Sequence, residues 1–369
     1  MCHIAHIQIN QKTQQEKLIP CSILRAFLRL ETETRLGRDG RDDDARLPAG
    51  LIMARPSRYI HDALLGYVHR PGHCEPGLTI DRHGLRSTGQ GPVDTPPQAI
   101  LAVGDSFTFG EAVQDLDTWP AQVQRLSGRP VLNGGVSGYG FDQIVLRAEQ
   151  LAAQHRPSLI VVGFIAEDIQ RIEMRRLWRH DKPWFALEGD ALVPKGLPVS
   201  PRARQSALAR ALRSLGAARP LELLLRRLGP RLQDRFGYHV RVQAAGTGEA
   251  IACRLTERLA ALQRTASAPV LLVAQYDARA WDHPAIAREQ RDMTGRLLDC
   301  GARNGLGVID SYAVLAGAPK PRRLYRSWHM NEAGHLVIAR LVAAAPLVTL
   351  GPGSEPPSDS PTPRGCARA

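Results

Sequence analysis

Residues 99–110, AILAVGDSFTFG, decide the fold of this chain and contain its first candidate for chemistry. The apolar run at residues 100–103 is typical of a strand buried on both faces of a parallel sheet. It stops at Gly104, Asp105 and Ser106, residue types that favour a turn. A turn after such a strand lies at the carboxyl edge of the sheet, where open α/β folds bind their ligands. Ser106 is therefore either a nucleophile or only part of a strand-ending turn.

The same pattern of a short apolar run followed by a helix repeats along the chain. After a first strand at residues 99–103, strands are predicted at residues 130–132, 158–162, 270–275 and 307–310, and helices at residues 111–126, 141–155, 250–265, 285–304 and 331–345. Mostly apolar strands that alternate with helices predict a parallel sheet covered by helices on both faces. We therefore expect one doubly wound α/β domain at residues 98–350, with five parallel strands.

A segment at about residues 170–248 interrupts this alternation and is predicted to be an insertion. Residues 171–200 are loop-like and carry an aromatic stretch at residues 178–185, and residues 206–228 form a basic helix pattern. The basic helix is either a solvated face with its leucines inward or a cap over the site. An insertion between strands at the catalytic edge is well placed to shape a substrate cleft.

The remaining segments are expected to lie outside the sheet. Residues 1–50 are dense in charge and are predicted to be a flexible N-terminal segment. Residues 51–97 form an irregular lead-in that packs on the core, with a hairpin pattern in GLTIDRHGLRS at residues 77–87. Residues 351–369, rich in Pro, Ser and Gly, predict a disordered tail.

Composition narrows the class of protein. A net charge of +12 is compatible with several kinds of polyanionic partner. Because the sequence has no interleaving of basic and aromatic residues and no recognised binding motif, we do not expect it to bind nucleic acid. No apolar run is long enough for a transmembrane segment, and none has the pattern of a signal peptide. The six cysteines are scattered without metal-ligand spacing, which predicts mostly reduced thiols and no metal site. These features favour a cytoplasmic protein, or an exported one if the start codon is misassigned.

Three segments at the predicted sheet edge supply the parts of a nucleophilic site. Such a site needs a nucleophile, a general base and donors for an oxyanion. Ser106 can supply the nucleophile, and His329, just before the last helix, can supply the base. The glycine-rich NGGVSGYG at residues 133–140 allows backbone N–H groups to approach a substrate oxygen closely.

Together these segments resemble the SGNH/GDSL hydrolase family of bacterial lipases and acylhydrolases. GDSFTFG is similar to the first block of the family, NGGVSGYG to the second, GFIAEDI to the third and WHMNEAGH to the fifth. The resemblance spans residues 99–341 apart from the insertion, and it implies a flavodoxin-like three-layer α/β/α sandwich. It implies Ser106 as the nucleophile, His329 as the base, and the N–H groups of Ser106 and Gly138 as the oxyanion hole. It implies no metal and no organic cofactor.

Two positions depart from the pattern of the family. The third block normally has an Asn that donates to the oxyanion, and this chain has Glu167, which must point away or be protonated because a carboxylate repels an oxyanion. The triad acid usually stands three residues before the histidine, where this chain has Arg326. Asp310 and Asp277 both end strands at the same edge, and Asp310 is preferred because it is nearer to His329 in the chain. The alternative for both is a helix cap or a loop hydrogen bond.

The sequence therefore predicts a serine-dependent acyl-ester hydrolase that forms an acyl-serine and acts on a small acyl ester or an O-acylated carbohydrate. The same site would serve an O-acyltransferase, since the acyl acceptor is either water or a sugar hydroxyl. A catalytically degenerate relative that binds a glycan or another acyl-bearing ligand is the third interpretation, motivated by Glu167 and Arg326. The sequence leaves the oligomeric state open.

Overall fold

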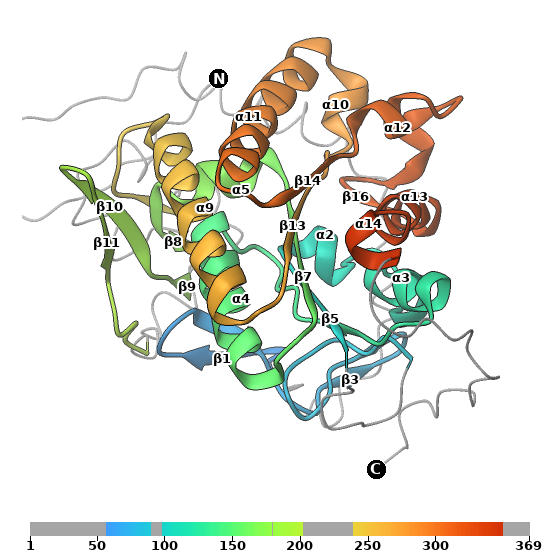
Figure 1. Ribbon diagram of the computed structural model, residues 1–369, viewed down its shortest axis with the longest axis horizontal. Coiled ribbons are helices and arrows are strands. Elements are labelled where there is room, and N and C mark those ends of the chain that lie inside the picture. Colours follow the sequence, from blue (N-terminus) through green and yellow to red (C-terminus); the bar gives the residue numbers. More distant parts are fainter. Residues whose placement is uncertain (1–56, 90–97, 179, 202–238, 350–369) are drawn as a thin grey trace, which may run out of the picture. The chain divides into compact units, whose positions relative to one another are not determined.

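The computed structural model describes residues 57–89, 98–178, 180–201 and 239–349. A five-stranded parallel sheet with the strand order β14-β13-β7-β5-β6 lies at its centre (Figure 1). Its strands are β5 (Ile100–Val103), β6 (Val131–Asn133), β7 (Leu159–Phe164), β13 (Val270–Ala274) and β14 (Gly307–Asp310). The predicted five-stranded parallel sheet is thus confirmed.

Helices cover both faces of this sheet. One face carries α4 (Phe141–His155), α9 (Thr247–Thr265) and α11 (Pro284–Arg303), and the other carries α3 (Trp119–Ser127) and α13 (Glu332–Ala343) (Figure 1). Successive side chains of a strand point to opposite faces. Leu101 and Val103 of β5 therefore pack with the first group of helices, and Ile100 and Ala102 with the second. Burial on both faces explains why β5 is apolar at every position.

The strand order places a switch point between β5 and β7. The chain runs from β5 outward to β6, and then returns past β5 to β7, β13 and β14. This is the order of flavodoxin-like folds, in which ligands bind where the connections from two neighbouring strands diverge. The expected flavodoxin-like three-layer sandwich is confirmed, and the segments after β5 and β7 flank its switch point.

One helix begins later than its pattern indicates. The helix expected at residues 111–126 begins at Trp119 as α3, after a 3₁₀ turn, η1 (Asp115–Asp117). Thr118 caps α3, because its hydroxyl accepts a hydrogen bond from a backbone N–H of the first turn (3.3 Å). Pro120 stands in that turn, where a missing N–H costs nothing. The structure also contains short helices that the sequence did not predict: α2 (Ser106–Phe109), α5 (Ala166–Arg171), α10 (Arg279–Asp282), α12 (Tyr312–Ala316), η2 (Pro321–Leu324) and α14 (Pro346–Thr349).

The lead-in before the sheet forms short antiparallel hairpins. They are β1 (Tyr59–Asp62) with β2 (Gly66–His69), and β3 (Cys74–Glu75) with β4 (Leu78–Thr79). The hairpin expected at residues 77–87 closes through an antiparallel bridge between Ile80 and Arg86. Arg86 N–H then donates to the Asn133 carbonyl at the end of β6 (2.9 Å), and Tyr67 is buried in the core. These contacts attach the lead-in to the edge of the central sheet.

The described part of the insertion is β structure, so the expectation of a loop at residues 171–200 was wrong. Its strands are β8 (Met174–Leu177), β9 (His180–Asp181), β10 (Trp184–Glu188), β11 (Ala191–Lys195) and β12 (Val240–Arg241). They form an antiparallel β12-β8-β9 sheet and a β10-β11 hairpin. Lys182 is buried and donates to the Asp142 carboxylate in α4, which ties the insertion to the core. The basic helix expected at residues 206–228 lies outside the described residues, as do residues 1–50 and 351–369.

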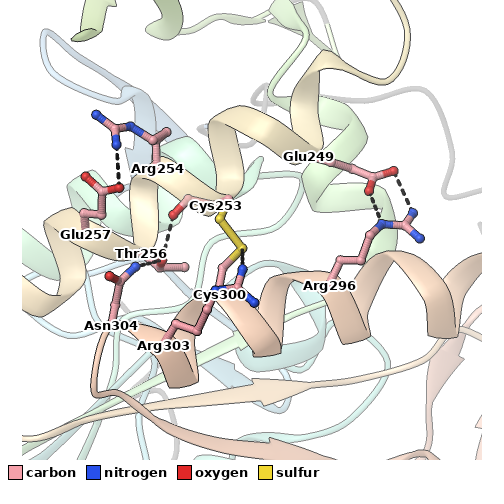
Figure 2. Close-up of a disulfide and its surroundings, with 9 residues drawn as sticks. All are labelled: Glu249, Cys253, Arg254, Thr256, Glu257, Arg296, Cys300, Arg303 and Asn304. Carbon is pink, nitrogen blue, oxygen red and sulfur yellow. Dashed lines mark hydrogen bonds and ion pairs between the residues drawn. A yellow bond between two sulfur atoms is a disulfide. The ribbon is translucent and has the colours of Figure 1, made fainter. Parts of the chain in front are cut away.

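A disulfide between Cys253 and Cys300 joins α9 to α11 (Figure 2). The two Cα atoms are 5.3 Å apart, although 47 positions separate them in the sequence. The expectation of reduced thiols was therefore wrong for this pair, because the pairing depends on which helices lie side by side. None of the helices in the described ranges is long and apolar enough to cross a membrane.

Candidate active site

The turn after β5 places Ser106 at the edge of the sheet. Asp105 caps α2, because its carboxylate accepts a hydrogen bond from a backbone N–H of the first turn (2.9 Å). Gly104 is needed at this turn, since a methyl group on it would lie 2.1 Å from Thr108 Oγ1 and 2.6 Å from the Gly163 carbonyl oxygen. That close approach lets β5 and β7 end side by side. Ser106 consequently begins α2 at the switch point of the sheet.

His329 comes from far along the chain and meets Ser106. It begins β16 (His329–Met330), which pairs with β15 (Tyr325–Arg326) directly before α13. Asn331 caps α13 by accepting hydrogen bonds from two backbone N–H groups (3.1 Å each), which fixes where the hairpin ends. His329 Nε2 lies 2.9 Å from Ser106 Oγ, within hydrogen-bonding distance. The structure therefore brings together the two residues that the sequence proposes as nucleophile and base.

Burial sets the protonation state of His329. Desolvation lowers the pKa of His329 below its ordinary value, and the negative charges of Asp105 and Glu111 offset part of this effect. The imidazole is therefore neutral at pH 7, so that its Nε2 can accept a proton from Ser106.

The loop after β6 carries Gly138 to the same edge of the sheet. Val136 N–H donates to the Gly104 carbonyl oxygen (2.9 Å), which joins this loop to the end of β5. The Tyr67 hydroxyl of the lead-in donates to the Ser137 carbonyl oxygen (2.9 Å). Gly138 has a φ of +82°, a left-handed conformation that favours glycine. The loop is thus held between β5 and the lead-in, on the edge that carries Ser106.

Glu167, at the position of the usual Asn donor, is held by two arginines. It lies in the first turn of α5, and its carboxylate is 3.5 Å from Arg171 and 3.5 Å from Arg279. The Arg279 guanidinium also lies over the Trp328 ring, 4.2 Å from its centroid, directly beside His329 in the chain. Pairing with two arginines offsets the negative charge of this carboxylate.

The buried Arg171 links the turns that follow β5 and β7. Its Nη1 lies 2.6 Å from the Asp168 carboxylate and 3.5 Å from that of Asp105, and donates to the Tyr139 carbonyl oxygen (3.0 Å). Asp168 also accepts a hydrogen bond from Ile165 N–H (3.0 Å). Asp168 therefore has a structural role, in which its carboxylate stabilises the turns around the site.

Asp310 is bound away from the imidazole. Its carboxylate accepts hydrogen bonds from the Tyr276 hydroxyl (2.8 Å) and from a backbone N–H of α12 (2.9 Å). These are the loop and cap contacts that the sequence offered as the alternative, and the structure does not bring Asp310 to His329. Arg326, at the usual place of the triad acid, donates to the Glu332 carboxylate (2.9 Å).

Asp277, the other candidate acid, is also bound elsewhere. Its carboxylate accepts hydrogen bonds from Arg279 (2.7 Å) and from Gln290 (2.9 Å). Within the described ranges, no carboxylate lies within hydrogen-bonding distance of His329. The geometry is that of a serine–histidine pair in which no acid contacts the histidine, while the Asp105 carboxylate lies 3.4 Å from Ser106 Oγ.

Glu111 lies beside this pair and was not singled out in the sequence. Its N–H donates to the Ser106 carbonyl oxygen (3.1 Å), and its carboxylate accepts hydrogen bonds from Arg58 (2.7 Å) and from the Ser137 hydroxyl. Burial acts to raise the pKa of Glu111, but Arg58 and these hydrogen bonds outweigh burial and hold the pKa below its ordinary value. The signal in the sequence was the position of Glu111 directly after GDSFTFG. The helix pattern assigned that residue to the start of a helix instead.

The chain is similar to several solved bacterial and metagenomic structures. A lipase/acylhydrolase from Enterococcus faecalis is 16% identical, with 67% of this chain and 93% of that one covered and a TM-score of 0.37. An acetylxylan esterase from Geobacillus stearothermophilus is 13% identical, with 69% and 97% covered and a TM-score of 0.40. An α/β hydrolase from the metagenome of Lake Arreo, Spain, is 14% identical, with 70% and 98% covered and a TM-score of 0.42. No curated protein matches the chain. At these identities and TM-scores, activity has to be argued from the site.

The comparison with family models is more specific. The model of the GDSL-like lipase/acylhydrolase family matches residues 102–337, which is more than half of the chain. The matched segment begins within β5 and ends within α13, so it includes Ser106, Gly138 and His329. The chain therefore belongs to the GDSL-like lipase/acylhydrolase family, a family of ester hydrolases.

Proposed function

We propose that this protein is a serine-dependent acyl-ester hydrolase in which Ser106 is the nucleophile and His329 is the general base. The observation that carries the proposal is the 2.9 Å distance between Ser106 Oγ and His329 Nε2 at the switch point of the sheet. A serine hydroxyl is a weak nucleophile, and an adjacent neutral imidazole is the group that activates it.

The residues support a two-step reaction through an acyl-serine. Ser106 Oγ attacks the ester carbonyl carbon while its proton passes to His329 Nε2. The oxyanion accepts hydrogen bonds from the N–H groups of Ser106 and Gly138, and His329 then protonates the departing alcohol oxygen as the ester C–O bond breaks. In the second step His329 takes a proton from water, whose oxygen attacks the acyl carbon, and the proton returns to Ser106 as the acid leaves.

The departures from the family pattern set the expected rate. The charges of Asp105 and Glu111 stabilise the His329 imidazolium without contact. Glu167 supplies no side-chain donor, and the loss of one oxyanion donor costs roughly a hundred- to thousandfold in rate. We expect slow turnover that still depends on the serine, because the oxyanion hole and substrate binding contribute separately.

A small acyl ester of a carbohydrate is the proposed substrate class. Its support is the aromatic stretch of the insertion, from which Trp178 contacts Gly138. An O-acyltransferase would use the same acyl-serine with a sugar hydroxyl in place of water. Product analysis separates the two activities, because only transfer gives an acylated sugar when free xylose is added to the reaction.

A relative that binds its ligand without turnover is the second candidate function. It is favoured by Glu167 at the donor position and by the lack of a carboxylate in contact with His329.

Labelling with a fluorophosphonate probe, together with hydrolysis of p-nitrophenyl acetate, tests the proposed function. We expect the protein to be labelled and to hydrolyse the ester, and Ser106→Ala to lose both properties. Ser158→Ala is the matched control, since Ser158 lies just before β7 at the opposite edge of the sheet, and it should keep both. Turnover that survives Ser106→Ala would exclude the serine mechanism. A folded protein that is neither labelled nor active would be the non-catalytic binder.

A further inference from the structure

A cavity of about 280 Å³ lies beside the disulfide that joins α9 to α11. Both Cys253 and Cys300 line it, together with the apolar side chains of Met293 and Leu297. This volume is near the lower limit for sites that bind small molecules. The cavity therefore leaves room for a small molecule next to the two sulfur atoms.

The two cysteines differ in how far solvent reaches them. Cys253 is partly exposed, whereas only 7% of the surface of Cys300 is exposed. In thiol–disulfide exchange a thiolate attacks one sulfur and expels the other, and access to the two sulfurs influences which one is attacked. Cys253 Sγ is therefore the sulfur within reach of a thiol, and Cys300 Sγ is the leaving group.

Arg303 lies beside the leaving sulfur. Its Nη2 donates a hydrogen bond to Cys300 Sγ (3.1 Å), as Figure 2 shows. A guanidinium favours a thiolate over a thiol, and a thiolate that is stabilised in this way leaves more readily. Asp299, an exposed carboxylate of the cavity wall, makes no ion pair with Arg303 in the part of the chain that the structure describes. The charge of Arg303 is thus available to the sulfur anion.

The other arginines around the disulfide are bound to carboxylates. Arg296 donates to the Glu249 carboxylate (2.9 Å), and Arg254 donates to the Glu257 carboxylate (2.8 Å) (Figure 2). Arg303 instead directs its guanidinium at the disulfide. Arg303 is therefore the arginine whose removal changes the charge felt by the leaving sulfur.

We propose that this cavity is a thiol–disulfide exchange site, at which a small-molecule thiol attacks Cys253 and releases the thiolate of Cys300 beside Arg303. The inference does not rest on the proposed ester hydrolysis. It makes the covalent link between α9 and α11 one that small thiols open in the folded protein.

The exchange takes place in two balanced steps. The incoming thiolate bonds to Cys253 Sγ as the bond between Cys253 and Cys300 breaks, which leaves a mixed disulfide and the Cys300 thiolate. A second thiolate then attacks the sulfur of the bound small thiol, and Cys253 departs as a thiolate. Two small thiols are thereby oxidised to one disulfide, the protein disulfide is reduced by two electrons, and the two protons lost by the small thiols pass to the two cysteines.

Brief treatment of the folded protein with glutathione tests which sulfur is attacked. An alkylating agent stops the reaction and caps each free cysteine thiol, and peptide mass spectrometry locates the glutathione. We expect glutathione on Cys253 and the alkyl group on Cys300. Glutathione on Cys300 instead would overturn the assignment.

The rate of reduction by dithiothreitol, measured without urea, tests the role of Arg303. We expect Arg303→Met to lower the second-order rate constant about tenfold, because the thiolate without its guanidinium is a poorer leaving group. Arg303→Lys keeps the positive charge and should restore most of the rate. Arg254→Met is the matched control, since Arg254 follows Cys253 in the chain but pairs with Glu257, and it should leave the rate unchanged.

Urea unfolding shows that each of these variants is folded before its rate is compared. An equal rate in Arg303→Met and in the unaltered protein would contradict the role of Arg303. Reduction at a rate that does not depend on the dithiothreitol concentration would mean that the protein must unfold before the thiol reaches the disulfide, and it would overturn the exchange site itself.

Discussion

At the scale of single residues, the charges of Asp105 and Glu111 act most strongly among the carboxylates on His329, and Asp277 acts more weakly in the same direction. All three charges raise the pKa of His329 against the larger effect of burial. Asp105 is the N-cap of α2, whereas the Glu111 carboxylate is held by hydrogen bonds from Arg58 and Ser137. Glu111 is therefore the residue at which the electrostatic contribution can be changed without removing the helix cap.

Glu111→Gln should shift the pH dependence of hydrolysis. Loss of the negative charge makes the imidazolium less stable, so the pKa of His329 falls and the acid limb of kcat/KM moves to lower pH. We expect kcat to fall about tenfold, or ~1.4 kcal/mol of lost imidazolium stabilisation. A pH–rate profile measures both effects.

Glu332→Gln is the control for this variant, because Glu332 pairs with the exposed Arg326. It should leave the acid limb in place. An acid limb that stays fixed in Glu111→Gln, or that moves to higher pH, would contradict a role for the charge of Glu111.

His335 makes the stability of the fold depend on pH. It is fully buried in α13, and its Nδ1 accepts a hydrogen bond from Trp119 N–H (3.1 Å). Desolvation lowers the pKa of His335 to about 3, so the unfolded chain binds a proton below pH 6.5 that the folded protein does not. Its contribution to stability is complete above pH 6.5 and is lost as the pH falls toward 3. The buried His69, whose pKa is also lowered by desolvation, acts in the same direction.

Urea unfolding at pH 8 and pH 5 tests this linkage. We expect His335 to account for a loss of about 2 kcal/mol of unfolding free energy between these values. His335→Gln lacks the titrating group, so its loss between the two pH values should be smaller by that amount. Equal losses in the variant and the unaltered protein would show that His335 does not titrate in this way.

At the scale of the elements, one buried arginine holds the connection between α2 and α3. Arg86 donates to the carbonyl oxygens of Phe109 (2.8 Å), Gly110 (2.5 Å) and Val113 (2.7 Å), and to the Asp115 carboxylate (2.9 Å). This stretch follows the helix that Ser106 begins, and it has no regular structure before η1. Hydrogen bonds from one guanidinium replace those that a helix would have supplied.

Arg86→Met should therefore destabilise the fold strongly. The variant leaves buried carbonyl groups and Asp115 without their donor, at a cost of about 3–5 kcal/mol. Urea unfolding measures the loss. Arg340→Met, at an exposed position of α13, should change the unfolding free energy by less than about 0.5 kcal/mol. A similarly small effect at Arg86 would mean that the connection is held by other contacts.

At the scale of the whole molecule, the disulfide connects two helices that cover the same face of the sheet (Figure 2). It closes a loop spanning 47 positions, and closing a loop of that length in the unfolded chain stabilises the fold by about 4 kcal/mol. We expect dithiothreitol to lower the urea midpoint of the unaltered protein accordingly. The variant Cys253→Ser/Cys300→Ser should have the lower midpoint from the start and should not respond to the reductant. A midpoint indifferent to reductant in the unaltered protein would contradict this role.

Local patterns predicted the central fold well because its inner strands β5, β7 and β13 are buried on both faces. The apolar run of β5 and the amphipathic repeat of α4 are dictated by their surroundings, and both lie where the sequence places them. The insertion was mispredicted because its strands have only two to five residues, and because β8 pairs with β12 across a long sequence separation. Such pairing leaves no periodic signal.

For the candidate site, the sequence by itself determined which residues could react. Ser106 follows a buried strand, and His329 precedes α13. Local sequence pattern and the resemblance to the family were enough to single out both residues. Tertiary structure alone decided what surrounds them. It put Nε2 2.9 Å from Oγ, bound Asp310 to Tyr276 and paired Glu167 with Arg171 and Arg279. The physical reason is that hydrogen bonds and charges act through space over a few ångströms. The positions of two residues in the chain do not by themselves indicate whether the folded protein brings them that close.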